Sequence, residues 1–335
     1  LSQAAHIAKK NEIYCTMIKN YSAKNRISAN EIVIFSLLLC FAGALAFGKG
    51  YSYAVTNGIK LWAATLLPAL FPYFFITAVL SGLSVTGRLS QKLSPVTRSL
   101  FRTNGITGYA FFISALSGYP VGAKTVADLK TRGLISETEA VRACSFCSSP
   151  SPMFLIASVG GLMFRDRALG ACVFFCNFLA VLTTGFLFSF YKRKERPSDN
   201  AESFSGANVS LYEATYSSVI SILVVGGIIA IFTVLSEILK DAGAFTPIEA
   251  FIGLFTKNEA VKKGVASGIF ECTAGLKELS LSGVNFCTLP IVAGICGFGG
   301  ICVIIQSAAY LKSAKIKIAP FLVAKLLEAI LSSVF

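Results

Sequence analysis

The sequence predicts an all-α polytopic membrane protein, built as an inverted repeat with two re-entrant hairpins and two discontinuous helices. The composition points to a bilayer: 54% of the 335 residues are hydrophobic and only 14% are charged, whereas soluble domains carry about 25% charge. Uncharged stretches long enough to cross a membrane recur along the chain. The two halves also share an ordered, weak similarity. High hydrophobicity excludes a disordered chain.

Charge-poor runs define the expected spans, in the order 32–48, 61–87, 103–123, 143–164, 168–191, 214–236 and 279–311. The end of the chain, 318–335, is apolar but carries Lys325 and Glu328. We expect the first run to be a span rather than a cleaved signal peptide, because no small-residue cleavage site separates it from the next. The chain starts at Leu1, so either its start codon is unusual or Met17 is the true start.

Basic residues set the expected orientation. Lys and Arg number 30 against 17 Asp and Glu, and cytoplasmic loops of membrane proteins are rich in Lys and Arg. We therefore place the basic N-terminal segment, 1–30, in the cytoplasm. The first membrane half would be 31–191, followed by a cytoplasmic linker, 192–213, and a second half, 214–335. Seven crossings, counting 318–335 and leaving out 103–123, then put the C-terminus outside.

A crossing at 103–123 would break this charge rule, because it would place four basic residues outside: Lys124, Lys130, Arg132 and Arg142. A re-entrant hairpin near 104–130, which enters and leaves on the cytoplasmic side, removes the conflict. Gly118 and Pro120 suit its tip, since both interrupt helices. Irregular backbone at membrane depth is tolerated only where it is buried or lines a cavity, so this tip predicts a site. A second hairpin, near 264–283, would enter from the outside.

The halves match at an offset near 155 residues. Val79-Leu80-Ser81 corresponds to Val234-Leu235-Ser236, Leu100-Phe101 to Leu254-Phe255, Gly108 and Ala110 to Gly264 and Ala266, Ser117-Gly118 to Ala274-Gly275, and Cys147 to Cys296. Because the two expected hairpins enter from opposite sides, these matches describe an inverted repeat. Inverted repeats are the signature of secondary transporters.

Two spans contain helix-breaking segments: Ser148-Ser149-Pro150-Ser151-Pro152 lies inside 143–164, and Gly297-Phe298-Gly299-Gly300 lies inside 279–311. Proline removes an amide donor and kinks a helix. Either segment alone would be explained by a simple kink or a glycine packing face. Broken helices in corresponding positions of two halves favour a substrate site at the midplane.

Four of these motifs resemble those of the nucleoside-recognition (Gate) domain membrane proteins, and within them the sporulation integral membrane proteins of the YlbJ type. They are Ser117-Gly118-Tyr119-Pro120-Val121-Gly122-Ala123-Lys124, Ser148-Ser149-Pro150-Ser151-Pro152, Glu271-Cys272-Thr273-Ala274-Gly275 and Phe298-Gly299-Gly300. The resemblance covers 32–335. It implies a fold similar to the concentrative nucleoside transporters. It also implies export of a small anionic metabolite, dipicolinate, during spore formation. The protein would then lie in the cytoplasmic or forespore membrane of a bacterium.

The expected substrate-binding residues gather at the hairpin tips and the breaks: Ser117, Gly118, Tyr119, Pro120, Lys124, Ser148, Ser149, Ser151, Glu271, Thr273, Gly297, Phe298, Gly299 and Gly300. A carboxylate inside a membrane is costly and usually faces a cavity or a partner. Glu271 would therefore bind a substrate group or carry a coupling proton, or else pair with Lys277 or Lys124. Lys124 would hold a substrate carboxylate, or else reach the surface and pair with Asp128.

The expected function is secondary transport of a small, anionic metabolite such as dipicolinate or a nucleoside-like molecule. No phosphate-binding Gly-x4-Gly-Lys-[Ser/Thr] motif is present, so an ion gradient or the cargo gradient would supply the energy. We expect neither an enzyme nor a cofactor, since the single His lies at position 6. The expected partners are the small-molecule substrate and the bilayer. We expect no nucleic acid partner, and the sequence leaves open whether the chain forms a homo-oligomer.

Two alternatives stay open beside transport of a metabolite. One is a non-transporting membrane scaffold or assembly factor in sporulation. The other is a metal-ion permease of the Gate family, using Cys144, Cys147, Cys272 and Cys296. We expect no resident metal site.

Overall fold

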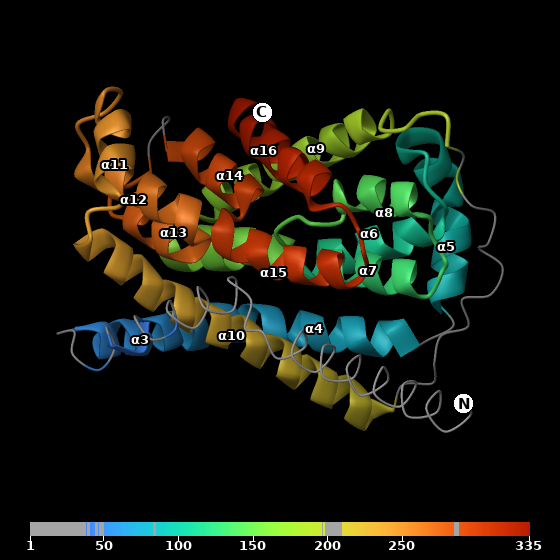
Figure 1. Cartoon of the computed structure of the whole chain (residues 1–335), viewed down its shortest axis with the longest axis horizontal. Helices are drawn as coiled ribbons and strands as arrows, with labels where there is room; N and C mark the ends of the chain where they lie inside the picture. Colours follow the sequence, from blue (N-terminus) through green and yellow to red (C-terminus); the bar gives the residue numbers. More distant parts are fainter. Residues whose placement is uncertain are drawn as a thin grey trace, which may run out of the picture. The chain divides into compact units, whose positions relative to one another are not determined.

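The computed structural model describes residues 38, 41–43, 46 and 50–335, except 83, 84, 196, 198–209 and 285–287. The chain divides into two units, Leu1–Tyr51 and Ser52–Phe335, and nearly all described residues belong to the second. The predicted segment 1–30 lies outside the described residues, as does most of the predicted span 32–48. All regular elements in the described part are helices (Figure 1), which confirms the all-helical class.

Four described helices are long and apolar enough to cross a membrane: Tyr51–Leu80, Arg167–Phe188, Leu211–Asp241 and Thr288–Ser313. The first combines α3 (Tyr51–Leu61), the π-helical η1 (Trp62–Leu66) and α4 (Leu67–Gly82); the second is α9 (Arg167–Phe188); the third is α10 (Leu211–Asp241); the fourth combines α14 (Thr288–Phe298) and α15 (Gly300–Ser313). About 20 helical residues span the ~30 Å hydrocarbon core. Large apolar side chains, such as Phe175 on α9 and Leu223 on α10, are exposed on these helices. Such surfaces are suited to lipid, and the chain is a multi-pass membrane protein.

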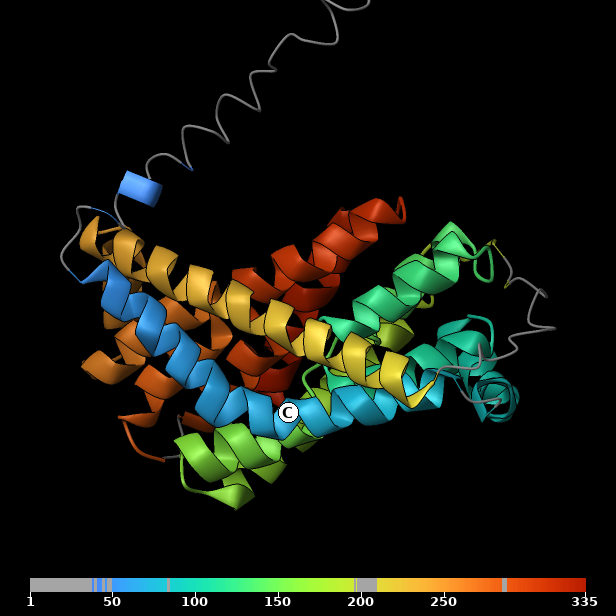
Figure 2. The same ribbon diagram turned by 90° about the horizontal axis from the view of Figure 1, so that it is seen from below.

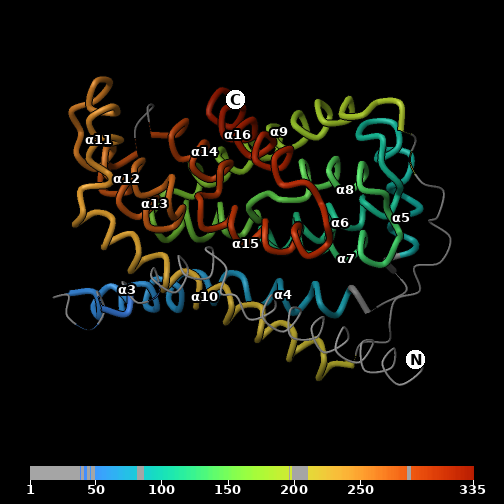
Figure 3. Tube along the Cα trace, viewed as in Figure 1, coloured from blue at the N-terminus to red at the C-terminus, as the bar shows by residue number. Residues whose placement is uncertain are grey.

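Shorter helices fill the space between them. They are α5 (Val85–Val96), η2 (Thr97–Phe101), α6 (Ile106–Ser117), α7 (Val121–Thr131), α8 (Glu137–Cys144), η3 (Phe154–Met163), α11 (Thr246–Gly253), α12 (Glu259–Phe270), α13 (Cys272–Ser280) and α16 (Ile318–Val334). Two pairs, α6–α7 and α12–α13, fold back on themselves as helical hairpins (Figure 3).

Several predicted boundaries were wrong. The span predicted at 61–87 begins at Tyr51, because 51–60 contains no proline and its one charge, Lys60, is tolerated. The run predicted as 279–311 has α13 at its start, and its helix begins only at Thr288. Residues 240–263, which lie between the expected span 214–236 and the expected hairpin near 264–283, hold α11 and the start of α12.

The helices pack around a shared interior. In the second unit, α10 lies along η1 and α4 (Figure 2), while α9, α14 and α16 pack against one another. Between these groups, α15 contacts both α7 and α12. Each of the two buried core clusters combines side chains from before and after 192–213: Phe146 packs in the same cluster as Phe321, and Leu155 in the same cluster as Leu276. The two halves of the sequence therefore share their core.

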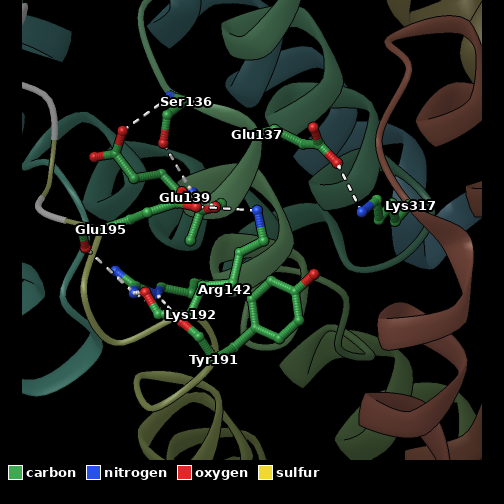
Figure 4. A network of polar contacts seen from close by, with 9 residues as sticks. Ser136, Glu137, Glu139, Arg142, Tyr191, Lys192, Glu195 and Lys317 are labelled. Atoms are coloured by element: carbon green, nitrogen blue, oxygen red, sulfur yellow. Dashed lines mark hydrogen bonds and ion pairs between the residues drawn. The ribbon is translucent and has the colours of Figure 1, made fainter.

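Arg142 is the largest fully buried side chain among the residues that the structure describes. It was predicted as a loop charge, but it lies on α8 and donates hydrogen bonds to the backbone carbonyls of Tyr191 at 2.8 Å and Lys192 at 3.1 Å (Figure 4). It also donates to the Arg102 carbonyl at 2.7 Å. Guanidinium carries several fixed donors, so one side chain ties α8 to the turn after η2 and to the end of α9.

The first turn of α8 is fixed by a capping box. The Ser136 hydroxyl accepts a hydrogen bond from the Glu139 amide at 3.2 Å, and the Glu139 carboxylate accepts from the Ser136 amide at 2.9 Å. The other oxygen of Glu139 accepts from the Asn104 amide at 2.9 Å. Nearby, hydrogen bonds from Thr138 and from Lys192 lower the pKa of the Glu195 carboxyl. Through the Glu139–Asn104 hydrogen bond, the N-terminus of α8 is joined to the segment that precedes α6.

We expect Ser136→Ala to lower the free energy of unfolding by about 1 kcal/mol, because the Glu139 amide in the first turn of α8 loses its acceptor. In detergent, this loss corresponds to a Tm lower by about 3 °C. Ser313→Ala is the matched control, since Ser313 is exposed and its hydroxyl donates to a carbonyl at the C-terminal end of α15. Equal Tm values for the two variants would contradict the role assigned to the capping box.

Candidate functional site

The tip of the first hairpin rests on a non-helical segment. α6 ends at Ser117 because Gly118 has a φ of 77° and Pro120 lacks an amide proton. Helix α8 ends at Cys144, and a helix resumes only at η3. A Cβ placed on Gly118 would lie 2.8 Å from the Ser151 amide nitrogen. The tip therefore contacts the backbone of the first break directly.

The tip of the second hairpin contacts the second break in the same way. α14 and α15 are separated at Gly299 and Gly300, which both have a φ of 80°. A Cβ on Gly300 would lie 3.0 Å from the Cys272 amide nitrogen, at the first residue of α13. Glu271 is 2% exposed and caps α13, accepting hydrogen bonds from the Thr273 amide at 3.0 Å and the Ala274 amide at 2.6 Å.

The two tips meet each other. The Tyr119 hydroxyl donates to the Cys272 sulfur at 3.8 Å, and a Cβ on Gly299 would lie 3.5 Å from the Tyr119 ring. Both tips and both broken elements therefore contribute to one cavity of about 50 Å³. This volume accommodates a few water molecules.

Seven of the residues predicted for the site line this cavity: Ser117, Gly118, Tyr119, Pro120, Ser151, Glu271 and Thr273. Lys124 lines two neighbouring cavities of about 210 and 270 Å³. The first of these also holds Asp128 and Arg132, and shares Ser117 with the central cavity.

The remaining predicted residues lie behind or beside the cavity. Ser149 lines a separate cavity next to Asn177. Ser148 is fully buried, and its carbonyl faces Lys325. A Cβ on Gly297 would lie 2.7 Å from the Ser332 hydroxyl, which places Gly297 against α16. Phe298, Gly299 and Gly300 form the break itself and do not line the cavity.

Helix N-termini give the cavity its electrostatic character. Pro120 and Gly299, the N-cap residues of α7 and α15, make no side-chain cap hydrogen bond. Pro120 lines the cavity, as do Cys302 and Val303 from the first turn of α15. Unsatisfied amides and the helix dipole make such ends favourable for anions. The N-terminus of α13, in contrast, is already occupied by the Glu271 carboxylate.

Sequence reasoning missed part of the lining. The cavity is also lined by Leu66 from η1, by Val225 and Ile229 from α10, and by Cys302 and Gln306 from α15. The apolar lining residues look like any membrane-facing side chain in the sequence. Gln306 carries a detectable signal, because it is an amide within an apolar run; its Nε2 donates to the Cys302 sulfur at 3.2 Å.

Metal-ligating side chains do not cluster in the part of the chain that the structure describes: no group of three or more His, Cys, Asp or Glu there could hold a metal ion. The described cysteines are all free thiols.

The comparisons with known proteins identify one relative. The chain is 29% identical over 338 aligned positions to the sporulation integral membrane protein YlbJ of Bacillus subtilis (strain 168), and the alignment covers 93% of this chain and 83% of the relative. No protein-family profile matches the chain. The similarity extends through both hairpins and both breaks, and it supports a membrane protein of the YlbJ type.

Proposed function

We propose that this chain, a membrane protein of the YlbJ type, is a secondary transporter that moves a small anionic metabolite across a bacterial membrane during spore formation. Dipicolinate and nucleoside-like molecules are the cargo classes to test first. Transport rather than catalysis is proposed, and the membrane is the cytoplasmic membrane or that of the forespore.

The convergence of two hairpin tips and two helix breaks on one cavity supports this proposal most strongly. Non-helical backbone inside a membrane is costly unless it lines a cavity. Here both hairpin tips and the first break line the same cavity, and α15, which follows the second break, lines it with its first turn. The N-termini of α7 and α15, whose N-cap residues make no side-chain cap hydrogen bond, favour an anion. A scaffold would gain nothing from keeping polar groups at these positions.

The proposed membrane arrangement makes α6–α7 and α12–α13 re-entrant hairpins that enter from opposite sides, with the N-terminus in the cytoplasm. Each hairpin then closes the site toward one side of the membrane, and the two hairpins open alternately. The cavity holds only a few water molecules, so loading cargo requires the tips to separate. The Tyr119–Cys272 contact would open in that step.

Glu271 is the group proposed to carry the coupling proton or to accept a hydrogen bond from the cargo. We expect Glu271→Gln to keep the fold, because the glutamine oxygen can still accept from one of the two amides that Glu271 caps on α13, but to remove the titratable carboxylate. The initial rate of labelled dipicolinate or nucleoside flux in proteoliposomes should fall about tenfold or more, as expected for the loss of one hydrogen bond to a charged group.

Glu278→Gln is the matched control, because it makes the same chemical change on α13 outside the cavity lining. Its flux should equal that of the wild type. Saturable flux that Glu271→Gln leaves unchanged would remove Glu271 from the mechanism. Folded wild-type protein that moves no tested anion, nucleoside or metal ion would favour the scaffold, whereas flux of a metal ion lost on replacing Cys272 and Cys296 by Ser would favour the permease.

A further inference from the structure

An ion pair is fully buried on α16, outside the cavity lining. The side chains of Lys325 and Glu328 are 0% and 1% exposed, and Lys325 Nζ lies 2.5 Å from Glu328 Oε2. Residues three apart share one face of a helix. Charged side chains at membrane depth are costly and normally serve an ion or substrate pathway, so this pair calls for a functional explanation.

The Lys325 ammonium binds the first break directly. Its nitrogen donates to the Ser148 carbonyl at 2.7 Å, in the non-helical segment between α8 and η3. It also lies 5.6 Å from the centre of the Tyr119 ring, at the tip of the first hairpin. A carboxylate, a backbone carbonyl released from helical pairing and an aromatic face therefore surround one positive charge, and each of them attracts cations.

More oxygen atoms around the pair have no protein partner. In the described part of the chain, the second oxygen of Glu328 and the hydroxyls of Ser148 and Ser332 are buried without a hydrogen bond. Ser332 lies one turn beyond Glu328 on α16, and it also contacts Gly297 at the second break. Oxygen ligands of this kind are those that hard cations prefer.

Neighbouring helices supply no other charge to balance Glu328. Four described helices pack against α16, namely α8, α9, α14 and α15. α14 has no charged residue, and α9 has only Arg167 at its far end. The positive charges of the other two are directed elsewhere: Arg142 of α8 donates to carbonyls of other segments, and Lys312 lies at the exposed end of α15. The other titratable groups that face the pair, Tyr119 and Cys147, carry no positive charge. Lys325 is therefore the counter-charge of Glu328.

We infer that Glu328, the Ser148 carbonyl and the Tyr119 ring form a monovalent-cation site, which the chain fills with its own Lys325 ammonium. The tethered ammonium takes the place that a bound Na⁺ or K⁺ would occupy at the break of a transporter helix. This inference rests on the proposed function in one respect, namely that the first break belongs to the transport site. It implies that Na⁺ does not drive transport through this break.

The test uses cation rescue of the purified full chain in detergent and needs no cargo. Lys325→Ala leaves Glu328 buried without its partner, so the Tm of this variant should lie about 10 °C below that of the wild type. Propylammonium chloride replaces the atoms of the lysine side chain beyond Cβ and should restore at least half of the loss. NaCl or KCl should restore part of it, and choline chloride, whose cation is too large, should restore nothing. The wild type should respond equally to all four salts.

Lys317→Ala is the matched control, because Lys317 precedes α16 with 61% of its side chain exposed; its Tm should not change, with or without added cations. Equal recovery of Lys325→Ala in choline and in propylammonium would overturn the inference, since it would show an effect of ionic strength alone. A wild-type Tm for Lys325→Ala would also overturn it.

A second pair of variants keeps the inference testable if Lys325→Ala does not fold. Lys325→Met retains the volume without the charge and should be unstable, whereas Lys325→Met/Glu328→Gln removes both charges and should recover most of the lost Tm. Equal instability of the single and double variants would contradict a charge-balancing role. None of these outcomes depends on flux, so their failure leaves the transport proposal standing. Failure of transport leaves the cation site standing and removes only its consequence for Na⁺ coupling.

Discussion

Gly122→Ala should disrupt the contact between the first hairpin and the first break, and it should abolish flux. A Cβ at this position would lie 1.6 Å from the Cys147 carbonyl oxygen and 2.4 Å from the Ser114 hydroxyl. The hydroxyl can rotate away, but the carbonyl belongs to the backbone of Cys147, which is fully buried. Either α7 or the segment after α8 must therefore shift.

The expected cost is large for a single methyl group. Overpacking usually costs 1–3 kcal/mol, and more where the neighbour cannot move, so we expect about 3 kcal/mol and a Tm lower by about 10 °C. Thermal unfolding in detergent, followed by tryptophan fluorescence or scanning calorimetry, measures this change. The same preparation tests flux in proteoliposomes.

Gly227→Ala is the matched control for this substitution. Gly227 lies within α10, and a Cβ there would meet nothing within 4 Å. Alanine also has the higher helix propensity, so Tm should stay constant or rise slightly. If Gly122→Ala behaves like Gly227→Ala, then α7 is not packed on Cys147 and the arrangement of the site is wrong.

Local signals in the sequence predicted the features that depend on local physics. Long uncharged runs identified α9 and α10, because crossing a bilayer requires about 20 apolar residues whatever the tertiary structure. Gly118 and Pro120 marked the end of α6, and Gly299 and Gly300 marked the separation of α14 from α15. In each case the residue type acts on its own backbone, because proline lacks an amide donor and glycine permits the positive φ found here.

Features that depend on distant partners were not predictable in the same way. Lys325 and Glu328 were visible as charges in an apolar segment, yet nothing nearby in sequence indicates that Lys325 donates to Ser148, 177 positions earlier. Arg142 was counted only as a loop charge, because its carbonyl partners come from two other segments. The contact between Tyr119 and Cys272 likewise joins two segments 153 residues apart.

These buried charges share a physical role that hydropathy cannot reveal. Arg142 and Lys325 both donate to backbone carbonyls outside regular helices. In a chain with many interrupted helices, unpaired carbonyls must be satisfied from within the protein, because lipid offers no donors. A long cationic side chain reaches several of them at once. Basic residues in apolar or short helices therefore carry information beyond orientation.

Arg142→Ala should accordingly be among the most damaging substitutions in the chain. It would leave the partly buried carbonyls of Arg102, Tyr191 and Lys192 without their donor. Hydrogen bonds to charged groups contribute about 1.5–3 kcal/mol each, and since such losses are not additive, we expect a total of about 4 kcal/mol.

Arg142→Lys separates charge from geometry in this network. An ammonium keeps the positive charge but cannot match the planar fork that reaches carbonyls in different directions, so it should recover less than half of the Tm lost in Arg142→Ala. Lys194→Ala, which removes an exposed charge close to the same turn, is the control and should leave Tm unchanged. Full recovery by lysine would show that charge alone matters, and it would contradict the role of Arg142 as the donor that joins α8 to the end of α9.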